Sequence, residues 1–246
     1  MKKDQISPDS ATAADLEHAM LAQANSSDAE ILMRFFKTGP GQYGEGDKFI
    51  GCTHPVTRRT AKAFRHLPVR EAVRAALSEW HEIRLCALLI LADKYQSKKT
   101  DDKERAAIFE QYAELARGGF VNNWDLVDLT APDITGAYAF EHGANTLERF
   151  AASGHLWEER IAVLSMFPFI RAKQLDVPFR MVDRVLPHPH DLMHKACGWM
   201  LREIGKRDRA ALTDYLEQNK AAMSRTTLRY AIEHYPEPER KAFLAR

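Results

Sequence analysis

A tryptophan and an aspartate four residues apart, Trp124 and Asp128, are the residues of this sequence whose types and spacing could do chemistry. If the stretch is helical, the two side chains share a face, because residues four apart are neighbours on a helix. An unpaired carboxylate is costly to bury, so an acid beside a large aromatic is either paired within the fold or kept for a reaction. Spacing alone favours a structural pair, with Trp124 in the core and Asp128 as a cap or ion-pair partner. The choice therefore depends on the rest of the chain.

The segments around this pair have the pattern of helices. Prolines stand just ahead of amphipathic segments, as expected at a first helical position, at Pro55, Pro68, Pro132, Pro178 and Pro189. Residues 102–116 end at Arg117-Gly118-Gly119, which is typical of a helix terminus. No alternating run of β-branched residues indicates a strand. We therefore predict an all-α chain.

Several of these segments look alike, each with a basic or polar residue just before a small and apolar helical run. The equivalent points are spaced by 44, 32, 35 and 32 residues and fall on Arg84, Asp128, Arg160, Lys195 and Thr227. These spacings fit the two-helix repeats of HEAT-like α-solenoids. We predict a single HEAT-like repeat domain over 1–246, with 1–30 as an N-terminal helical segment and 31–246 as the repeat region. Residues at the equivalent points would gather on the concave face.

The composition is that of a globular protein, with 246 residues, 45% hydrophobic and 28% charged. The longest apolar run, 86–92, is too short to cross a bilayer, and no signal-like segment follows Met1. We expect a cytoplasmic protein. Cys52, Cys86 and Cys197 include no Cys-x-x-Cys pair, so we predict small core residues rather than disulfides or a zinc site.

The formal net charge of +1 conceals two basic regions. Residues 34–74 hold nine Lys or Arg against three acids, and residues 155–229 hold thirteen against nine. A basic face of this kind is typical of a polyanion-binding protein. The alternative is ordinary solvated helix surface.

A Gly-rich loop spans residues 38–51. It lacks the Lys-Ser/Thr ending of a P-loop and follows no strand. Its backbone amides could still approach a phosphate, with Lys37 and Lys48 on either side. A plain connector is the alternative.

Three histidines, His188, His190 and His194, invite a metal interpretation because the last two are four residues apart. Asp191 follows His190 where the HExxH pattern requires Glu, and no cysteine pair is near. We therefore predict no metal site, and surface histidines at a helix start after Pro189.

The order and spacing of four motifs carry a resemblance to a known family. They are Phe49-Ile50-Gly51 with Pro55 and Arg58, Asn123-Trp124-Asp125-Leu126-Val127-Asp128, Leu156-Trp157-Glu158-Glu159-Arg160-Ile161-Ala162, and Lys195-Ala196-Cys197-Gly198-Trp199-Met200-Leu201-Arg202-Glu203. From about Glu30 to the C-terminus the chain resembles the AlkD-type DNA alkylation repair proteins, bacterial DNA glycosylases built from HEAT-like repeats. The Gly-rich loop before Phe49 is longer than in the family.

The resemblance implies a right-handed α-solenoid with a concave basic face, and an active site made of Trp124, Asp128, Arg160 and Trp199. Alkylation makes a purine cationic and activates it as a leaving group. A carboxylate such as Asp128 can stabilise positive charge on the sugar and direct water. The indoles of Trp124 and Trp199 can attract a cationic base, by about 0.5–2 kcal/mol each, and Arg160 suits a phosphate held by two hydrogen bonds. No cofactor is implied.

The expected partner is double-stranded DNA containing alkylated bases, bound by a bacterial, nucleoid-associated monomer with no membrane contact and no obligate protein partner. The candidate DNA contacts are Lys37, Lys48, Arg58, Arg59, Arg84, Lys195 and Arg202. For Arg84 and Arg202 an internal salt bridge is an equal alternative.

Three functions remain open at this point. The first is a monofunctional glycosylase that excises 3-methyladenine and 7-methylguanine type bases in base excision repair. The second is a non-catalytic HEAT-like protein that binds damaged or branched DNA. The third is a protein-binding HEAT scaffold, which would need no carboxylate clustered with indoles.

Overall fold

The computed structural model describes residues 11–245, and this part of the chain is helical throughout. Its β-structure is confined to one isolated bridge between Lys48 and Trp80. The prediction of an all-α chain is thereby confirmed. The residues form two compact units, unit 1 up to Ile134 and unit 2 from Thr135 onward. The two units are described one after the other, and a single domain over 1–246 stays a prediction.

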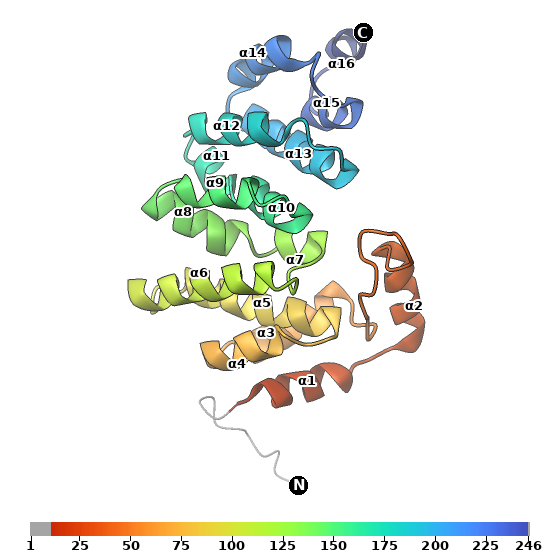
Figure 1. Ribbon diagram of the computed structural model, residues 1–246, viewed down its shortest axis with the longest axis vertical. Helices are drawn as coiled ribbons and strands as arrows, with labels where there is room; N and C mark the ends of the chain where they lie inside the picture. Colours follow the sequence, from red (N-terminus) through yellow and green to blue (C-terminus); the bar gives the residue numbers. More distant parts are fainter. Residues whose placement is uncertain (1–10, 246) are drawn as a thin grey trace. The chain divides into compact units, whose positions relative to one another are not determined.

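From residue 11 onward, unit 1 consists of seven α-helices and part of a π-helical turn (Figure 1). Their bounds are α1 Ala13–Leu21, α2 Ser26–Phe35, α3 His54–Ala63, α4 Val69–Ala75, α5 His81–Gln96, α6 Asp102–Arg117 and α7 Trp124–Asp128, and the turn η2 covers Pro132–Gly136 across the unit boundary. The helix predicted over 102–116 is α6, with Gly118 at its C-cap.

The centre of unit 1 is α5, which packs against α1, α3, α4, α6 and α7. Every residue of the helix from His81 to Ala92 is buried. A helix that is apolar on all sides must be surrounded by other elements, so the long apolar run of the sequence becomes the axis of the unit. At its start, however, the buried residues are charged or polar: His81, Glu82 and Arg84.

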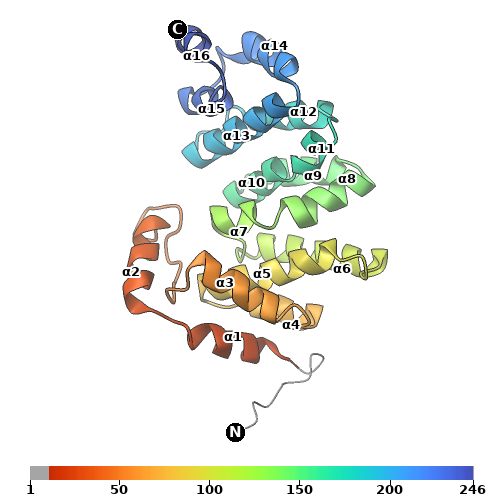
Figure 2. The ribbon, with the colours of Figure 1, turned by 180° about the vertical axis from the view of Figure 1, so that it is seen from behind.

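Helix α2 and the loop that follows it stand beside the N-terminal ends of α3 and α5 (Figures 1 and 2). Two backbone hydrogen bonds hold this arrangement. The amide of Asn25 donates to the carbonyl of Ile50 at 2.9 Å, and the amide of His81 donates to the carbonyl of Lys48 at 2.8 Å. The loop therefore connects α2 directly to the start of the central helix.

Unit 2 is also built from packed helices, with α13 at its centre. Their bounds are α8 Ala137–His142, α9 Asn145–Ala151, α10 Leu156–Leu164, α11 Phe167–Arg171, α12 Asp176–Val185, α13 Asp191–Arg207, α14 Arg209–Asn219, α15 Arg225–Ala231 and α16 Glu237–Leu244. Gly198 lets α13 approach α15 closely, because a Cβ there would lie 2.6 Å from the carbonyl oxygen of Thr227.

The repeat pattern found in the sequence corresponds to consecutive helix pairs. Each equivalent point lies in the second helix of a pair: Arg84 in α5, Asp128 in α7, Arg160 in α10, Lys195 in α13 and Thr227 in α15. The prediction of two-helix repeats is confirmed, while the handedness of the solenoid and its concave face stay predictions.

The three cysteines are buried with free thiols, as predicted. Burial raises the pKa of the Cys197 thiol to about 12. Among the described residues, no helix is both long and apolar enough to span a bilayer.

A substitution at Gly51 tests how closely the Gly-rich loop packs against the backbone at the start of α2. Its φ is +87°, and a Cβ would lie 1.9 Å from the carbonyl oxygen of Asn25. We expect Gly51→Ala to lower the free energy of unfolding by about 2–5 kcal/mol, because backbone strain adds to a clash with main chain. Gly41, with φ +73° and no atom within 4 Å of a Cβ, is the matched control; its alanine variant should lose only about 1–2 kcal/mol. Equal losses in urea unfolding would contradict the close packing.

Candidate functional site

The candidate pair lies on the short helix α7, whose first and last residues are Trp124 and Asp128. The side chain of Asn123 accepts a hydrogen bond from the Trp124 amide at 2.9 Å and so begins the helix. Both members of the pair are partly exposed, whereas the three residues between them are buried. The helix predicted from the spacing is present, and it leaves an indole and a carboxylate accessible together.

Trp124 is the first of four rings that lie on one another, which we call the aromatic stack. The other three rings belong to Phe36, Phe49 and His81. Trp124 lies on Phe36 with ring centroids 5.1 Å apart and planes 15° apart. Phe36 stacks on Phe49 at 5.0 Å, and Phe49 stacks on the imidazole of His81 at 4.4 Å. Phe35 meets the edge of Trp124 at 5.9 Å and is 60% exposed. Contact with Phe36 on one face therefore fixes the orientation of the indole.

The last ring of the stack belongs to a buried charge network formed by His81, Asp47, Asp125, Arg84 and His54. The imidazole of His81 bridges two carboxylates, with Nδ1 2.7 Å from Asp47 and Nε2 3.0 Å from Asp125. Asp47 also accepts from Arg84, and Asp125 lies 3.1 Å from Nε2 of His54. The network joins the loop before α3, the start of α5 and the start of α7.

The carboxylates hold His81 in its charged form. Burial by itself would lower the pKa of His81, but Asp125 and Asp47 outweigh that effect and raise the pKa to about 9. In return, although burial opposes it, the charge of His81 holds the pKa of Asp125 well below its usual range. Asp47 likewise has a lowered pKa, against its burial, because His81 and Arg84 face it. Two buried negative charges are thus matched by two positive charges.

The Gly-rich loop is folded onto this network and does not offer its amides to a ligand. All five of its glycine amides donate within the protein: Gly39 to Gln42, Gly41 to Glu45, Gly44 to the Lys37 carbonyl, Gly46 to the Thr38 carbonyl and Gly51 to Glu82. The buried carboxylate of Glu82 also accepts from the amides of Ile50 and Cys52. The phosphate interpretation of this loop is therefore wrong, and the connector interpretation holds.

Sequence reasoning missed several of the residues that hold the candidate site in place. They are Phe36, Asp47, His81, Glu82 and Asp125. The available signal was the group His81, Glu82 and Arg84 at the start of an otherwise apolar helix, because charged residues there need buried partners. Their partners lie too far away in sequence for spacing to identify them.

In unit 2, Trp199 and Arg160 differ in how much of the side chain is accessible. Trp199 is partly exposed, meets Phe167 edge-on at 5.3 Å, and donates from Nε1 to Glu203 at 3.2 Å. Arg160 is only 4% exposed and donates from Nη1 to the carbonyl of Leu192 at 2.6 Å. The burial does not fit a guanidinium held open for a phosphate, so Arg160 is better described as a residue that ties α10 to the start of α13.

The three histidines singled out in the sequence, His188, His190 and His194, have structural contacts in unit 2. His190 caps α13, accepting from the Leu192 amide at 3.1 Å. His188 lies 2.9 Å from Glu159, and His194 is hydrogen-bonded to the carbonyl of His188 at 2.6 Å. Within residues 11–245 no group of three or more His, Cys, Asp or Glu side chains could hold a metal ion.

Two of the seven candidate DNA contacts must be corrected. Arg84 is 4% exposed, and besides Asp47 its guanidinium donates to Asn122 and to the carbonyl of Phe120. The Arg202 side chain is 19% exposed and pairs with Glu233. Both guanidinium groups are therefore bonded within the fold. The internal salt bridge, which was the alternative to DNA contact, is present in both cases.

The other five candidates lie nearer the surface, and their charges differ in how far they are neutralised. Two of them pair with acids: Lys48 with Glu79 at 2.6 Å and Lys195 with Asp191 at 2.7 Å. Such surface pairs contribute about 0–1 kcal/mol, so a phosphate could replace the acid. Lys37, Arg58 and Arg59 are exposed and have no ion pair within the described part of the chain. A role of these five in DNA binding stays a prediction.

Comparison with known proteins identifies relatives of this chain. The family model described as DNA alkylation repair enzyme matches residues 16–235. A solved structure described as a predicted DNA alkylation repair enzyme from Enterococcus faecalis resembles 87% of this chain and 97% of its own, with a TM-score of 0.66 and 15% sequence identity. At that identity the likeness concerns the fold alone. No curated protein matches the sequence.

The charge network makes stability depend on pH in a defined direction. The pKa of His81 is about 9 in the fold, against an ordinary value near 6.5, so its contribution is complete below about pH 6.5 and lost as the pH rises through 9. We expect the free energy of unfolding to fall by a few kcal/mol across this interval, at about 1.4 kcal/mol per pKa unit. His81→Gln should flatten the profile and lower stability at pH 6. His54→Gln removes a half-exposed contact to the same Asp125 and should leave the profile in place. A wild-type profile that is flat from pH 6.5 to 9 would refute the buried imidazolium.

Proposed function

The chain belongs to the DNA alkylation repair enzyme family, and we propose that it is a DNA glycosylase that releases cationic alkylpurines of the 3-methyladenine and 7-methylguanine type. The bond broken is the N-glycosidic bond of the damaged nucleotide in duplex DNA. Water supplies the oxygen that joins the sugar carbon, and the base leaves with the bonding electron pair, which neutralises its positive charge. No cofactor takes part in the proposed reaction.

The observation that carries this proposal is the contrast between the two aspartates of α7. Asp125 is fully buried, and its carboxylate meets His54 and His81. Asp128, three residues later, is partly exposed on the same short helix as Trp124. Asp128 is thus the acid of α7 that shares partial exposure with Trp124, which supports a chemical role for it.

Asp128 suits the charge that develops in this reaction. As the cationic base departs, positive charge moves onto the sugar, and a carboxylate held in place stabilises it without reorganisation at the moment of reaction. The same carboxylate can orient the attacking water and accept its proton. Because the base is already cationic, no acid is needed to protonate it.

Trp124 offers the remaining surface of its indole to the lesion, since Phe36 covers one face. A cationic purine over the indole would gain about 0.5–2 kcal/mol, depending on how far water is excluded. The family resemblance adds Trp199 as a second indole, and this assignment rests on the resemblance. Arg160, which is 4% exposed, is not part of the proposal.

A base-release assay tests the proposal directly. The protein is incubated with a duplex containing 7-methylguanine, and the free base is measured. The alternative is a non-catalytic HEAT-like protein that binds damaged or branched DNA, which the exposed cations Arg58 and Arg59 would serve equally well. That alternative predicts salt-dependent DNA binding with no free base released.

The role of Asp128 can be separated from that of a structural acid. We expect Asp128→Asn to reduce single-turnover release by about a hundredfold or more, the scale of losing one electrostatic stabiliser. DNA affinity should be equal or somewhat tighter, because a negative group facing a polyanion is removed. The melting temperature should fall less than in Asp125→Asn, because Asp128 is partly exposed whereas Asp125 is buried.

Asp125→Asn is the matched control, since it makes the same chemical change three residues away in α7. It removes a charge on which the buried imidazolium of His81 depends, so it should lower the melting temperature strongly. A stable Asp128→Asn protein that binds DNA and releases 7-methylguanine at the parental rate would exclude Asp128 from the mechanism.

A further inference from the structure

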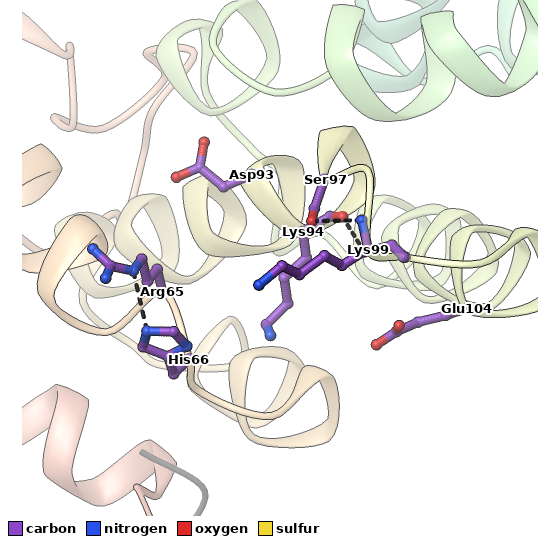
Figure 3. A pocket seen from close by; sticks show the side chains of 8 residues that line it. Arg65, His66, Asp93, Lys94, Ser97, Lys99 and Glu104 are labelled. Carbon is purple, nitrogen blue, oxygen red and sulfur yellow. Dashed lines mark hydrogen bonds between the residues drawn. The ribbon is translucent and has the colours of Figure 1, made fainter.

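A polar pocket opens in unit 1 at the far end of α5 from the charge network (Figure 3). The cavity has a volume of about 440 Å³. Its basic lining consists of Arg65 and His66, which follow α3, with Lys94 near the end of α5 and Lys99 just after it. None of these residues takes part in the candidate site, so the pocket requires its own explanation.

The basic side chains of the pocket point toward one another. In Figure 3 the amino groups of Lys94 and Lys99 extend to the same side, facing Arg65 and His66. Of the two acids of the lining, Asp93 points away from the amino groups, whereas the carboxylate of Glu104 is turned toward the pocket from its opposite margin. Within the described residues none of these six groups forms an ion pair. Four basic side chains against two acids, with no ion pair among them, favour an anionic ligand.

The end of α5 does not oppose an anion as a bare helix C-terminus would. Its last carbonyls are already occupied by hydrogen bonds from within the protein. Thr100 Oγ1 and the Ser97 amide both donate to the carbonyl of Lys94, at 2.6 and 3.1 Å. Arg105 donates to the carbonyl of Tyr95 at 3.2 Å. These hydrogen bonds reduce the partial negative charge that the end of α5 would present to an anion.

Helix α3 connects the candidate site to this pocket. At its start His54 contacts Asp125, the neighbour of Trp124, and two residues after its end Arg65 lines the pocket. The exposed residues Arg58, Arg59 and Lys62 between them form what we call the cationic ridge, and none has an ion pair in the described structure. The chain from residue 53 to residue 70 contains no acid. The cationic ridge thus carries positive charge, not neutralised by acids, from the candidate site toward the pocket.

The length of this path matches a short run of nucleotides. The eleven steps along the chain from His54 to Arg65 span about 16 Å at 1.5 Å per helical residue. One strand of duplex DNA advances about 3.4 Å per nucleotide. The pocket therefore lies roughly four or five nucleotides from the damaged base if the strand follows α3.

We propose that the pocket binds a backbone phosphate of DNA flanking the lesion, and that the cationic ridge carries the strand to it. For its ligand this inference rests on the proposed function. It is independent of catalysis, because a protein that binds DNA without releasing a base could use the same path.

The test is the double variant Lys94→Gln/Lys99→Gln, measured by fluorescence anisotropy on a duplex with a central 7-methylguanine over a salt series. Loss of one phosphate contact should reduce the slope of log affinity against log salt by about 0.9 and weaken binding about three- to tenfold near 0.1 M salt. Base release at saturating protein should be unchanged. Lys94→Arg/Lys99→Arg should restore affinity. On a duplex that ends about two base pairs beyond the lesion on the pocket side, variant and parent should bind alike.

The control variant Lys98→Gln/Lys103→Gln removes the same charge from exposed positions outside the pocket. It should keep the parental slope. An equal loss in both variants, or parental affinity in the pocket variant, would overturn the inference while leaving the glycosylase proposal untouched. Binding of inorganic phosphate that the pocket variant abolishes, with duplex affinity unchanged, would assign the pocket to a free phosphate instead. Absence of DNA binding by the wild type would overturn both.

Discussion

The contact on which unit 1 depends is the buried imidazolium of His81 between the carboxylates of Asp47 and Asp125. Each of the three groups would be costly to bury alone, and together with Arg84 they balance in charge. Because Asp47 belongs to the loop, His81 to α5 and Asp125 to α7, one set of ion pairs fixes three segments. Phe49 and Phe36 then transmit that position to Trp124 through ring stacking.

This arrangement explains how a helix of five residues can hold the proposed site pair, Trp124 and Asp128, in place. A helix so short gains little from its own hydrogen bonds, since nucleation costs most of what the first turn provides. Its position is instead set by tertiary contacts at Asp125, by the Asn123 cap and by the buried residues Leu126 and Val127. Trp124 and Asp128 lie at the two ends of the anchored segment, where both are partly exposed.

Charge is distributed along the chain in a way that its net value of +1 does not reveal. Arg84, Arg160 and Arg202 are largely enclosed and bond within the fold, which is a structural use of cations. Arg58, Arg59 and Lys62 remain exposed without acids nearby in sequence. Three of the nine basic residues counted over 34–74 therefore lie exposed on one helix, α3.

The sequence by itself determined the helical class, the ends of helices such as α6, the paired repeats and the burial of the cysteines. These features follow from local patterns, namely apolar periodicity, proline and glycine positions and residue type. It also marked Trp124 and Asp128 and carried the resemblance to the family that the comparisons confirm. Local pattern could not say which aspartate of α7 is buried, because both follow Trp124 within four residues.

Only the tertiary structure decided that Asp125 meets His81, that Arg84 meets Asp47, and that Glu82 holds the loop amides. In each of these contacts the partners lie 30 to 44 residues apart in the chain. No spacing rule connects residues at such separations. Their pairing depends on which helix ends come together when the apolar α5 is enclosed, and the cost of burying an unpaired charge then selects the partners.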